Sequence, residues 1–80
     1  MRLDKYLKNS RLIKRRTVAK EACEQERVRV NGKVAKPGAE LSEGDIVEIE
    51  FGSGSVRVKV LDLSENVRKE NAASMYEVLE

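Results

Sequence analysis

The chain begins with apolar residues at the spacing of an α-helix. Leu3, Tyr6 and Leu7 lie at positions i, i+3 and i+4, so residues 2–8 predict a short amphipathic helix with these three side chains on its buried face. The Asn-Ser pair at residues 9–10 is poorly suited to a helix interior and predicts its end. The basic residues of this stretch fall outside the apolar stripe: Arg2, Lys5 and Lys8.

A second helix is predicted to begin at Thr17 and to run to about residue 25. Threonine is a favourable N-cap, because its hydroxyl accepts a hydrogen bond from a free N–H group of the first turn. The residues expected to be buried are Leu12 and Ile13 ahead of this helix and Val18, Ala19, Ala22 and Cys23 within it.

After the second helix the period of the pattern changes from 3.6 to 2. Residues 27–36 predict a short hairpin, because RVRV and KVAK flank Asn31-Gly32, the pair favoured in two-residue type I′ turns. Pro37-Gly38 ends this hairpin.

A second pair of strands follows a turn at residues 42–45 (SEGD). Residues 45–51 and 56–63 both alternate, and the Gly-Ser loop at residues 52–55 joins them into a hairpin. The residues expected to face the core are Val47, Ile49 and Phe51 in the first strand and Val56, Val58 and Val60 in the second.

The end of the chain predicts a third helix from about residue 66. The order of helices, hairpin, strand pair and C-terminal helix predicts an α+β fold, in which helices pack on one side of a small, bent antiparallel sheet. The apolar side of the last helix would contain Ala72, Met75, Tyr76 and Leu79.

Composition excludes several kinds of chemistry. Eighty residues allow one domain with a small core and little room for a deep catalytic cavity. No apolar run approaches the roughly 18 residues of a membrane span, so a soluble, cytoplasmic protein is expected. The single Cys23 cannot form an internal disulfide, and the chain has no histidine, which disfavours zinc binding and histidine acid/base catalysis. We therefore expect no cofactor, no metal and no enzymatic activity.

Positive and negative charges are segregated along the chain. Residues 1–36 contain twelve Lys and Arg against four Asp and Glu, whereas residues 37–80 contain four against ten. Asp4 is the one acid among the first twenty residues, which carry eight basic side chains. A basic half of this density indicates a polyanionic partner, most often a nucleic acid.

The basic residues gather where a helix start disfavours them. Arg15 and Arg16 directly precede the predicted cap and Lys20 lies in the first turn, where each cation costs about a few tenths of a kcal/mol against the helix dipole. A local rule broken repeatedly in one place indicates a functional site. Free N–H groups at a helix start bind phosphate, and the planar arginine fork binds it bidentately.

Other basic residues extend this surface. If the residues ahead of Thr17 are also helical, Arg11, Lys14 and Arg15 share one face, and the basic residues of the first helix continue it. The alternative is that these are ordinary solvating charges, but that alternative also predicts interspersed acids.

Three residues have two interpretations each. Asp4 is either a first-turn acid favoured by the helix dipole, or a carboxylate that orients an arginine or accepts a bond from a base edge or 2′-hydroxyl. Tyr6 either packs in the core or stacks on a base, and Cys23 is expected to pack as a small apolar residue rather than to act as a nucleophile. With three aromatic residues in all, structured RNA is a better match than a stacked single strand.

Five motifs occur in a recognisable order: RLDKxL at the start, [ST]xAxxA in the second helix, the RVxVNG hairpin, KP, and the GDxV/I turn and strand. Together they make residues 1 to about 51 resemble the S4 domain, the small RNA-binding domain first described in ribosomal small-subunit protein four. The resemblance implies that residues 1–62 form this alpha-L-type domain and that residues 63–80 form a C-terminal tail.

With its NAASMY tail, the whole chain is similar to stand-alone members of that family. These are relatives of bacterial heat-shock protein 15 and, more closely, ribosome-associated quality-control factors of the RqcP (YabO) type. The resemblance implies binding to large ribosomal subunits obstructed by peptidyl-tRNA, and we expect a monomer without a membrane partner. Such factors contact 23S rRNA and the P-site tRNA and assist C-terminal alanine tailing by an RqcH-type protein.

The resemblance also implies which residues bind RNA. This chain departs from the family pattern at Glu26, where many members have glycine. Glycine at this position commonly ends a helix in the left-handed conformation. The expected RNA-binding residues are Arg2, Asp4, Lys5, Lys8, Arg11, Lys14, Arg15, Arg16 and Lys20, with Arg29, Asn31 and Lys33 on or near the hairpin as second-tier contacts.

The sequence leaves several alternative functions. The same class includes a heat-shock-protein-15-like rescue factor without a role in tailing, which would be expected to carry a longer basic C-terminal extension, and a generic structured-RNA-binding module. An enzyme is a further alternative, because S4 domains occur fused to pseudouridine synthases and methyltransferases, but no catalytic constellation is recognisable. A protein adaptor would instead use the acidic residues of 40–50 and 62–80.

Overall fold

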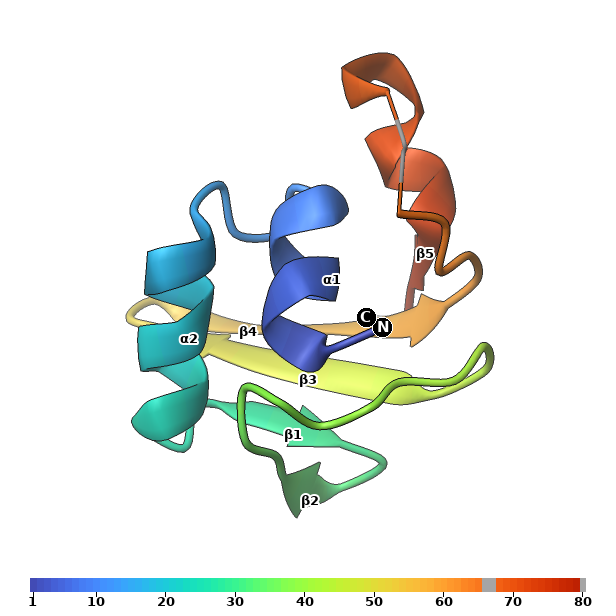
Figure 1. Ribbon diagram of the computed structural model, residues 1–80. Coiled ribbons are helices and arrows are strands. Elements are labelled where there is room, and N and C mark those ends of the chain that lie inside the picture. Colours follow the sequence, from blue (N-terminus) through green and yellow to red (C-terminus); the bar gives the residue numbers. More distant parts are fainter. Residues whose placement is uncertain (66–67, 80) are drawn as a thin grey trace.

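Within residues 1–65 and 68–79, which the computed structural model describes, two α-helices and one 3₁₀-helix cover one face of a five-stranded antiparallel sheet (Figure 1). This arrangement confirms the predicted α+β fold class. The elements in chain order are α1 (Leu3–Asn9), α2 (Arg16–Glu24), β1 (Val28–Val30), β2 (Lys33–Val34), β3 (Ile46–Phe51), β4 (Gly54–Val60), the 3₁₀-helix η1 (Lys69–Met75) and β5 (Tyr76–Val78).

The sheet has the strand order β2-β1-β3-β4-β5, so the first hairpin and the C-terminal strand form its two edges. Val30 pairs with Lys33 across the Asn31-Gly32 turn. Both turn residues have positive φ, 53° at Asn31 and 84° at Gly32, as a type I′ turn requires. The hairpin predicted from this dipeptide is therefore confirmed.

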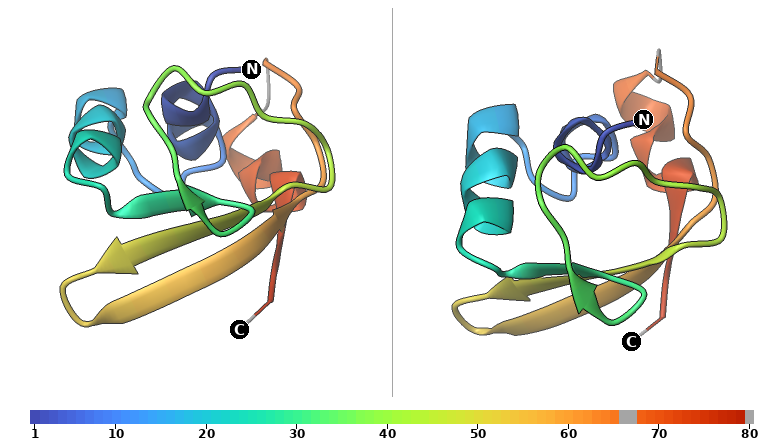
Figure 2. Two further views of the ribbon diagram at one scale, coloured as in Figure 1. Left: turned by 90° about the horizontal axis from the view of Figure 1, so that it is seen from below. Right: turned by 60° about the horizontal axis from the view of Figure 1, so that its bottom comes forward.

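The hydrophobic core lies between the sheet and the helices (Figure 2). Strand alternation places every second side chain of β1, β3 and β4 on this covered face. The largest fully buried apolar side chains are Leu3, Tyr6 and Leu7 of α1, Val28, Val47, Ile49, Val58 and Val60 of the sheet, and Met75 of η1.

Phe51 departs from the expected core face of β3. Its side chain is 43% exposed, and it pairs with Gly54 beside the β3–β4 turn. There the β3–β4 hairpin extends beyond the described helices (Figure 2). The prediction that Phe51 is buried was wrong, because alternation defines the face of a strand but not how far the helices reach along it.

The N-cap of α2 lies two residues earlier than predicted, and Thr17 falls inside the helix. The N-cap is Arg15, in an extended conformation and without a side-chain cap. Ala19 and Cys23 are buried on the inner face, whereas Val18 is 47% exposed, so the prediction for Val18 was also wrong. The sequence contains two overlapping apolar stripes, and the stripe with the smaller side chains is the one that allows α2 to pack closely on α1.

The C-terminal segment forms a 3₁₀-helix and an edge strand instead of the predicted α-helix. Ala72 and Met75 are buried as expected, but the chain becomes extended at Tyr76 and pairs with β4. Tyr76 and Val78 favour strands, and β4 offers an edge with free backbone groups. The first residues of the predicted helix, 66–67, lie outside the described residues.

α2 ends at a residue with left-handed backbone conformation, Glu26, whose φ is 62°. The N–H of Glu26 donates to the carbonyl of Cys23 (3.0 Å), and the N–H of Arg27 donates to the carbonyl of Ala22 (2.9 Å), which is the bond pair of a Schellman motif. The helix therefore keeps a glycine-type ending without the glycine. A residue with a Cβ costs about 1–2 kcal/mol in this conformation.

Replacing Glu26 by glycine is expected to stabilise the protein by about 0.5–1 kcal/mol, since the relief of strain exceeds the extra freedom of glycine in the unfolded chain. Thermal unfolding followed by circular dichroism should show a Tm higher by about 2–6 °C. The matched control is Gln25→Gly, one residue earlier at a φ of −85°, which should lower the Tm. An unchanged Tm in Glu26→Gly would contradict the strain at this position.

Candidate RNA-binding surface

A buried carboxylate joins the starts of the two α-helices. Asp4, in the first turn of α1, is 2% exposed. It accepts two hydrogen bonds from Arg2, Nε to Oδ1 and Nη2 to Oδ2, both 3.2 Å long. Nη2 of Arg16, the first residue of α2, lies 3.5 Å from Oδ1. We call Arg2, Asp4 and Arg16 the Asp4 cluster; its contacts match the interpretation in which Asp4 orients neighbouring arginines.

The two arginines of the Asp4 cluster contact the carboxylate of Asp4 and are also partly exposed to solvent. The side chains of Arg2 and Arg16 are 50% and 47% exposed, although their partner Asp4 is buried. Each guanidinium has five N–H donors, so donors remain for an external ligand. A shallow hollow of about 370 Å³ adjoins the cluster, and its lining residues are Met1, Arg2, Lys5, Arg16, Glu40, Leu63 and Glu65.

The start of α2 adds backbone donors next to Arg16. No side chain caps this helix, and its first turn contains no acid. The N–H of Ala19 donates to the carbonyl of Arg15, which leaves the N–H groups of the preceding turn without a helical acceptor. Together with the helix dipole, these donors favour an anion at this position.

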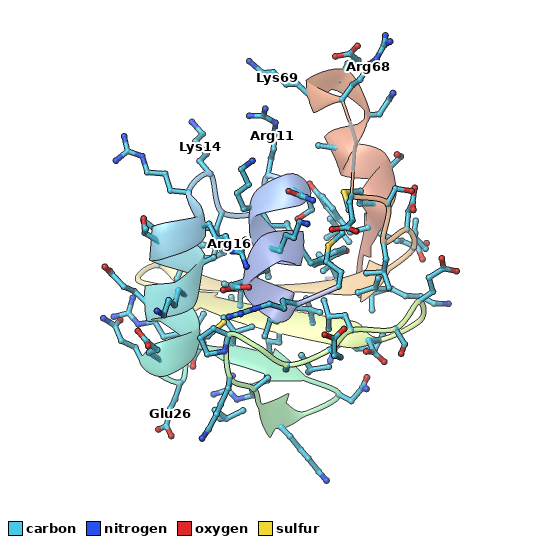
Figure 3. The ribbon with its side chains drawn as sticks, viewed as in Figure 1. Arg11, Lys14, Arg16, Glu26, Arg68 and Lys69 are labelled. Carbon is cyan, nitrogen blue, oxygen red and sulfur yellow. The ribbon has the colours of Figure 1, made fainter. Side chains whose placement is uncertain are left out.

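The loop between α1 and α2 carries three exposed basic residues in a non-helical conformation. Arg11 has a φ of 62°, and the N–H of Ile13 donates to the carbonyl of Leu7 (3.1 Å), which turns the chain away from the axis of α1. Residues 10–15 are therefore not helical, so the condition under which Arg11, Lys14 and Arg15 would share a helical face is not met. Arg11 and Lys14 nevertheless project from one end of the molecule (Figure 3).

The remaining basic residues of the helices differ in their contacts. Lys5 forms an ion pair with Glu65 of the C-terminal segment, and this pairing lowers the pKa of the Glu65 carboxyl. Lys8, in the last turn of α1, and Lys20, on α2, are exposed. Among the described residues these two lysines form no ion pair, whereas the ammonium of Lys5 already has a carboxylate partner.

The hairpin residues are not brought together with the Asp4 cluster. Arg29 lies on the sheet face opposite the helices, where it forms ion pairs with Glu48 (3.3 Å) and Glu50 (2.9 Å). The side chain of Asn31 ties the turn to β3, since Nδ2 donates to Asp45 (3.2 Å) and Oδ1 accepts from the N–H of Ile46 (3.0 Å). Lys33 lies on the edge strand β2 and is exposed. Its contact with RNA stays a prediction, separate from the Asp4 cluster.

The other candidate groups serve the core. Burial raises the pKa of the Cys23 thiol to about 11, so this side chain is a protonated thiol near neutral pH. Tyr6 is fully buried and donates its hydroxyl to the carbonyl of Met75, and burial raises its pKa. In the described part of the chain, no cluster of three or more His, Cys, Asp or Glu could hold a metal ion, and no helix is long and apolar enough to cross a membrane.

A family model and a solved structure identify the class of protein to which the chain belongs. The family model of the S4 domain matches residues 1–47, which contain α1, α2 and the first hairpin. A solved structure described as trimeric heat shock protein 15 of Vibrio cholerae superposes with a TM-score of 0.91 at 28% identity, and the match covers 99% of this chain and 81% of that one.

Two relatives are much more similar in sequence. Both are named RQC P-site tRNA stabilizing factor: that of Halalkalibacterium halodurans is 59% identical over 98% of this chain and 89% of the relative, and that of Streptococcus pneumoniae is 54% identical over 99% and 90%. The chain therefore belongs to the S4-domain family and, within it, to the group of small proteins whose members carry this name.

Proposed function

We propose that this protein is a non-enzymatic RNA-binding factor of ribosome-associated quality control. It binds large ribosomal subunits obstructed by peptidyl-tRNA, contacts 23S rRNA and the P-site tRNA, and assists C-terminal alanine tailing by an RqcH-type protein. The observation that carries the proposal is the Asp4 cluster, which presents two half-exposed arginines at the starts of both helices. The names of its relatives supply the ribosomal context.

The Asp4 cluster is suited to phosphate rather than to base edges. The carboxylate of Asp4 occupies one side of the Arg2 guanidinium and fixes its plane, so less side-chain entropy is lost when an anion binds the free donors. Arg16 and the uncapped start of α2 offer donors of the same kind beside it. Double-stranded RNA is recognised mainly through phosphates and 2′-hydroxyls, which matches these donors.

The exposed basic residues around the cluster extend the same surface. Lys8, Lys20 and Arg15 add positive charge that is sequence-independent and positions the protein on the RNA backbone, whereas Arg11 and Lys14 project from one end of the molecule (Figure 3). We propose that the protein acts as a monomer in the cytoplasm, where one such surface docks on each obstructed subunit.

Salt dependence of binding tests this function. Affinity for purified bacterial large subunits carrying peptidyl-tRNA is expected to fall about a thousandfold between 50 and 200 mM salt, as contact with about six phosphates requires. Co-sedimentation over a salt series measures this slope. A slope near zero, or co-purification with ribosomal material that survives nuclease treatment, would instead indicate a protein adaptor.

The structural likeness to heat shock protein 15 favours a second candidate, a large-subunit rescue factor without a role in tailing. Both candidates bind the same kind of particle, so binding does not separate them. The length of alanine tails on a stalled reporter protein does, when cells with and without the gene are compared. Shortened tails in the deletion strain support the first function, and unchanged tails support the second.

A further inference from the structure

The C-terminal segment is fixed against α1 by contacts at both ends. The buried hydroxyl of Tyr6 donates to the carbonyl of Met75 (2.9 Å), at the end of η1. Near the other end, Nδ2 of Asn9 donates to the carbonyl of Glu65 (3.3 Å), whose side chain pairs with Lys5. These contacts hold Glu65 and Met75, which precede and follow Arg68 and Lys69 in the chain, against α1.

This placement brings two cations from the acidic half of the chain to the basic end of the helices. Arg68 is the N-cap of η1 and Lys69 its first residue, and both side chains are exposed. Figure 3 shows them projecting from the same end of the molecule as Arg11 and Lys14. We call these four residues the end cluster.

Among the described residues, the end cluster lacks ion pairs, as do Arg15, Arg27 and Arg57, and it differs in this from three other arginines. Arg2, Arg16 and Arg29 each pair with a carboxylate. Within residues 1–65 and 68–79, no member of the end cluster forms an ion pair. Of the nearby acids, Glu65 is already paired with Lys5, and Glu70 is exposed beside Lys69. The positive charge of this end is thus largely uncompensated.

Arg11, one member of the end cluster, has a left-handed backbone conformation. With a φ of 62°, this position would suit glycine or asparagine better than a long side chain. Arg11 follows α1 as Glu26 follows α2: its N–H donates to the carbonyl of Lys8 (3.1 Å), so the left-handed conformation here ends the helix. The exposed side chain of Arg11 projects from the same end of the molecule as Arg68 and Lys69 (Figure 3).

We propose that the end cluster is a second phosphate-binding surface, in which Arg68 and Lys69 contact an RNA backbone segment other than the one held by the Asp4 cluster. The inference rests on the proposed function. RNA is favoured over an acidic protein, because the buried core of a protein interface is enriched in apolar and aromatic side chains and depleted of charged ones. The exposed large apolar side chains of the described residues are Val18, Val34, Phe51, Leu61 and Val78, none of which belongs to residues 8–15 or 68–70.

The test is the double variant Arg68→Gln/Lys69→Gln. Its matched control is Arg57→Gln/Lys59→Gln, which removes two exposed cations from β4, in the same half of the chain. Affinity for large subunits carrying peptidyl-tRNA is expected to fall about fivefold to tenfold in the first variant, and the slope of log K against log salt should decrease by about 2. The control should stay within about twofold of wild type.

Directed hydroxyl-radical cleavage identifies the ligand as RNA. An iron chelate attached to a Lys69→Cys variant should cut the backbone of rRNA or tRNA in the complex. Wild-type protein taken through the same labelling is the control, since its Cys23 is buried and its thiol protonated.

Two outcomes overturn the inference. One is wild-type affinity and salt slope in Arg68→Gln/Lys69→Gln while an Arg16 variant loses binding, which leaves the proposed function standing. The other is reduced affinity without RNA cleavage from position 69, which would indicate a ribosomal protein as the ligand. If the Arg16 variant also binds like wild type, the proposed function itself fails.

Discussion

Replacing Arg16 by glutamate is expected to weaken binding to large ribosomal subunits by about 100-fold. The substitution removes a cation that lies at the start of α2, and it places a second carboxylate beside the buried Asp4. Loss of a charge-assisted phosphate contact together with repulsion of the phosphate amounts to about 3 kcal/mol, which is about 100-fold in affinity. Co-sedimentation with purified subunits at fixed salt measures it.

The control for Arg16→Glu is Arg57→Glu, which makes the same charge change on β4. This variant should lose affinity only through the general change in net charge, by about threefold or less. Circular dichroism at the assay temperature establishes that both variants are folded. If Arg16→Glu co-sediments at wild-type occupancy, the Asp4 cluster is not the RNA contact.

The strands could be predicted from sequence because the information that fixes them is local. Asn31 and Gly32 both take the positive φ that their type I′ turn requires, and Val47 and Ile49 alternate with polar residues as a one-sided strand demands. The register of α2 could not be predicted, since Val18 and Ala19 both extend an apolar stripe. Packing against α1 selects the smaller residue, and that choice is tertiary.

The C-terminal strand was missed for a related reason. Residues after Met75 have a weak helical pattern, and the edge of β4 that pairs with Tyr76 and Val78 exists only in the folded sheet. Tertiary pairing thus overrides a local preference that a short segment cannot enforce.

The candidate site was predictable in composition but not in geometry. Charge counts locate the basic half, yet the proximity of Arg2 and Arg16 to Asp4 depends on how α1 packs against α2. One separation could have been foreseen: Arg29 alternates with the buried Val28 and must therefore face away from the helices.

Arg68 and Lys69 were also missed in the sequence, although a signal exists. They are adjacent cations in a half of the chain that contains only four, and the other two, Arg57 and Lys59, belong to a strand. A basic pair outside the regular pattern of an acidic segment is a reason to ask which surface it joins.

Replacing Asp4 by asparagine separates the effect of net charge from that of preorganisation. Asparagine keeps the size of the side chain, but its amide group opposes a donor of Arg2 with another donor, and the two arginines lose their shared counter-charge. We expect a loss of about 1–2 kcal/mol of stability, at the low end of the range for buried charged groups because both arginines are half-exposed. The Tm should fall by about 10 °C.

The same substitution is expected to weaken binding to large subunits about tenfold, since Arg2 and Arg16 are no longer held in place before the phosphate arrives. The matched control is Glu48→Gln, which removes the carboxylate paired with Arg29 on the opposite face. Both variants raise the formal net charge from +2 to +3, so attraction to RNA through net charge alone would tighten binding equally in both. Weaker binding in Asp4→Asn and unchanged or tighter binding in Glu48→Gln would show that the buried carboxylate acts by orienting the arginines. Tighter binding in both would reduce Asp4 to a structural residue of α1.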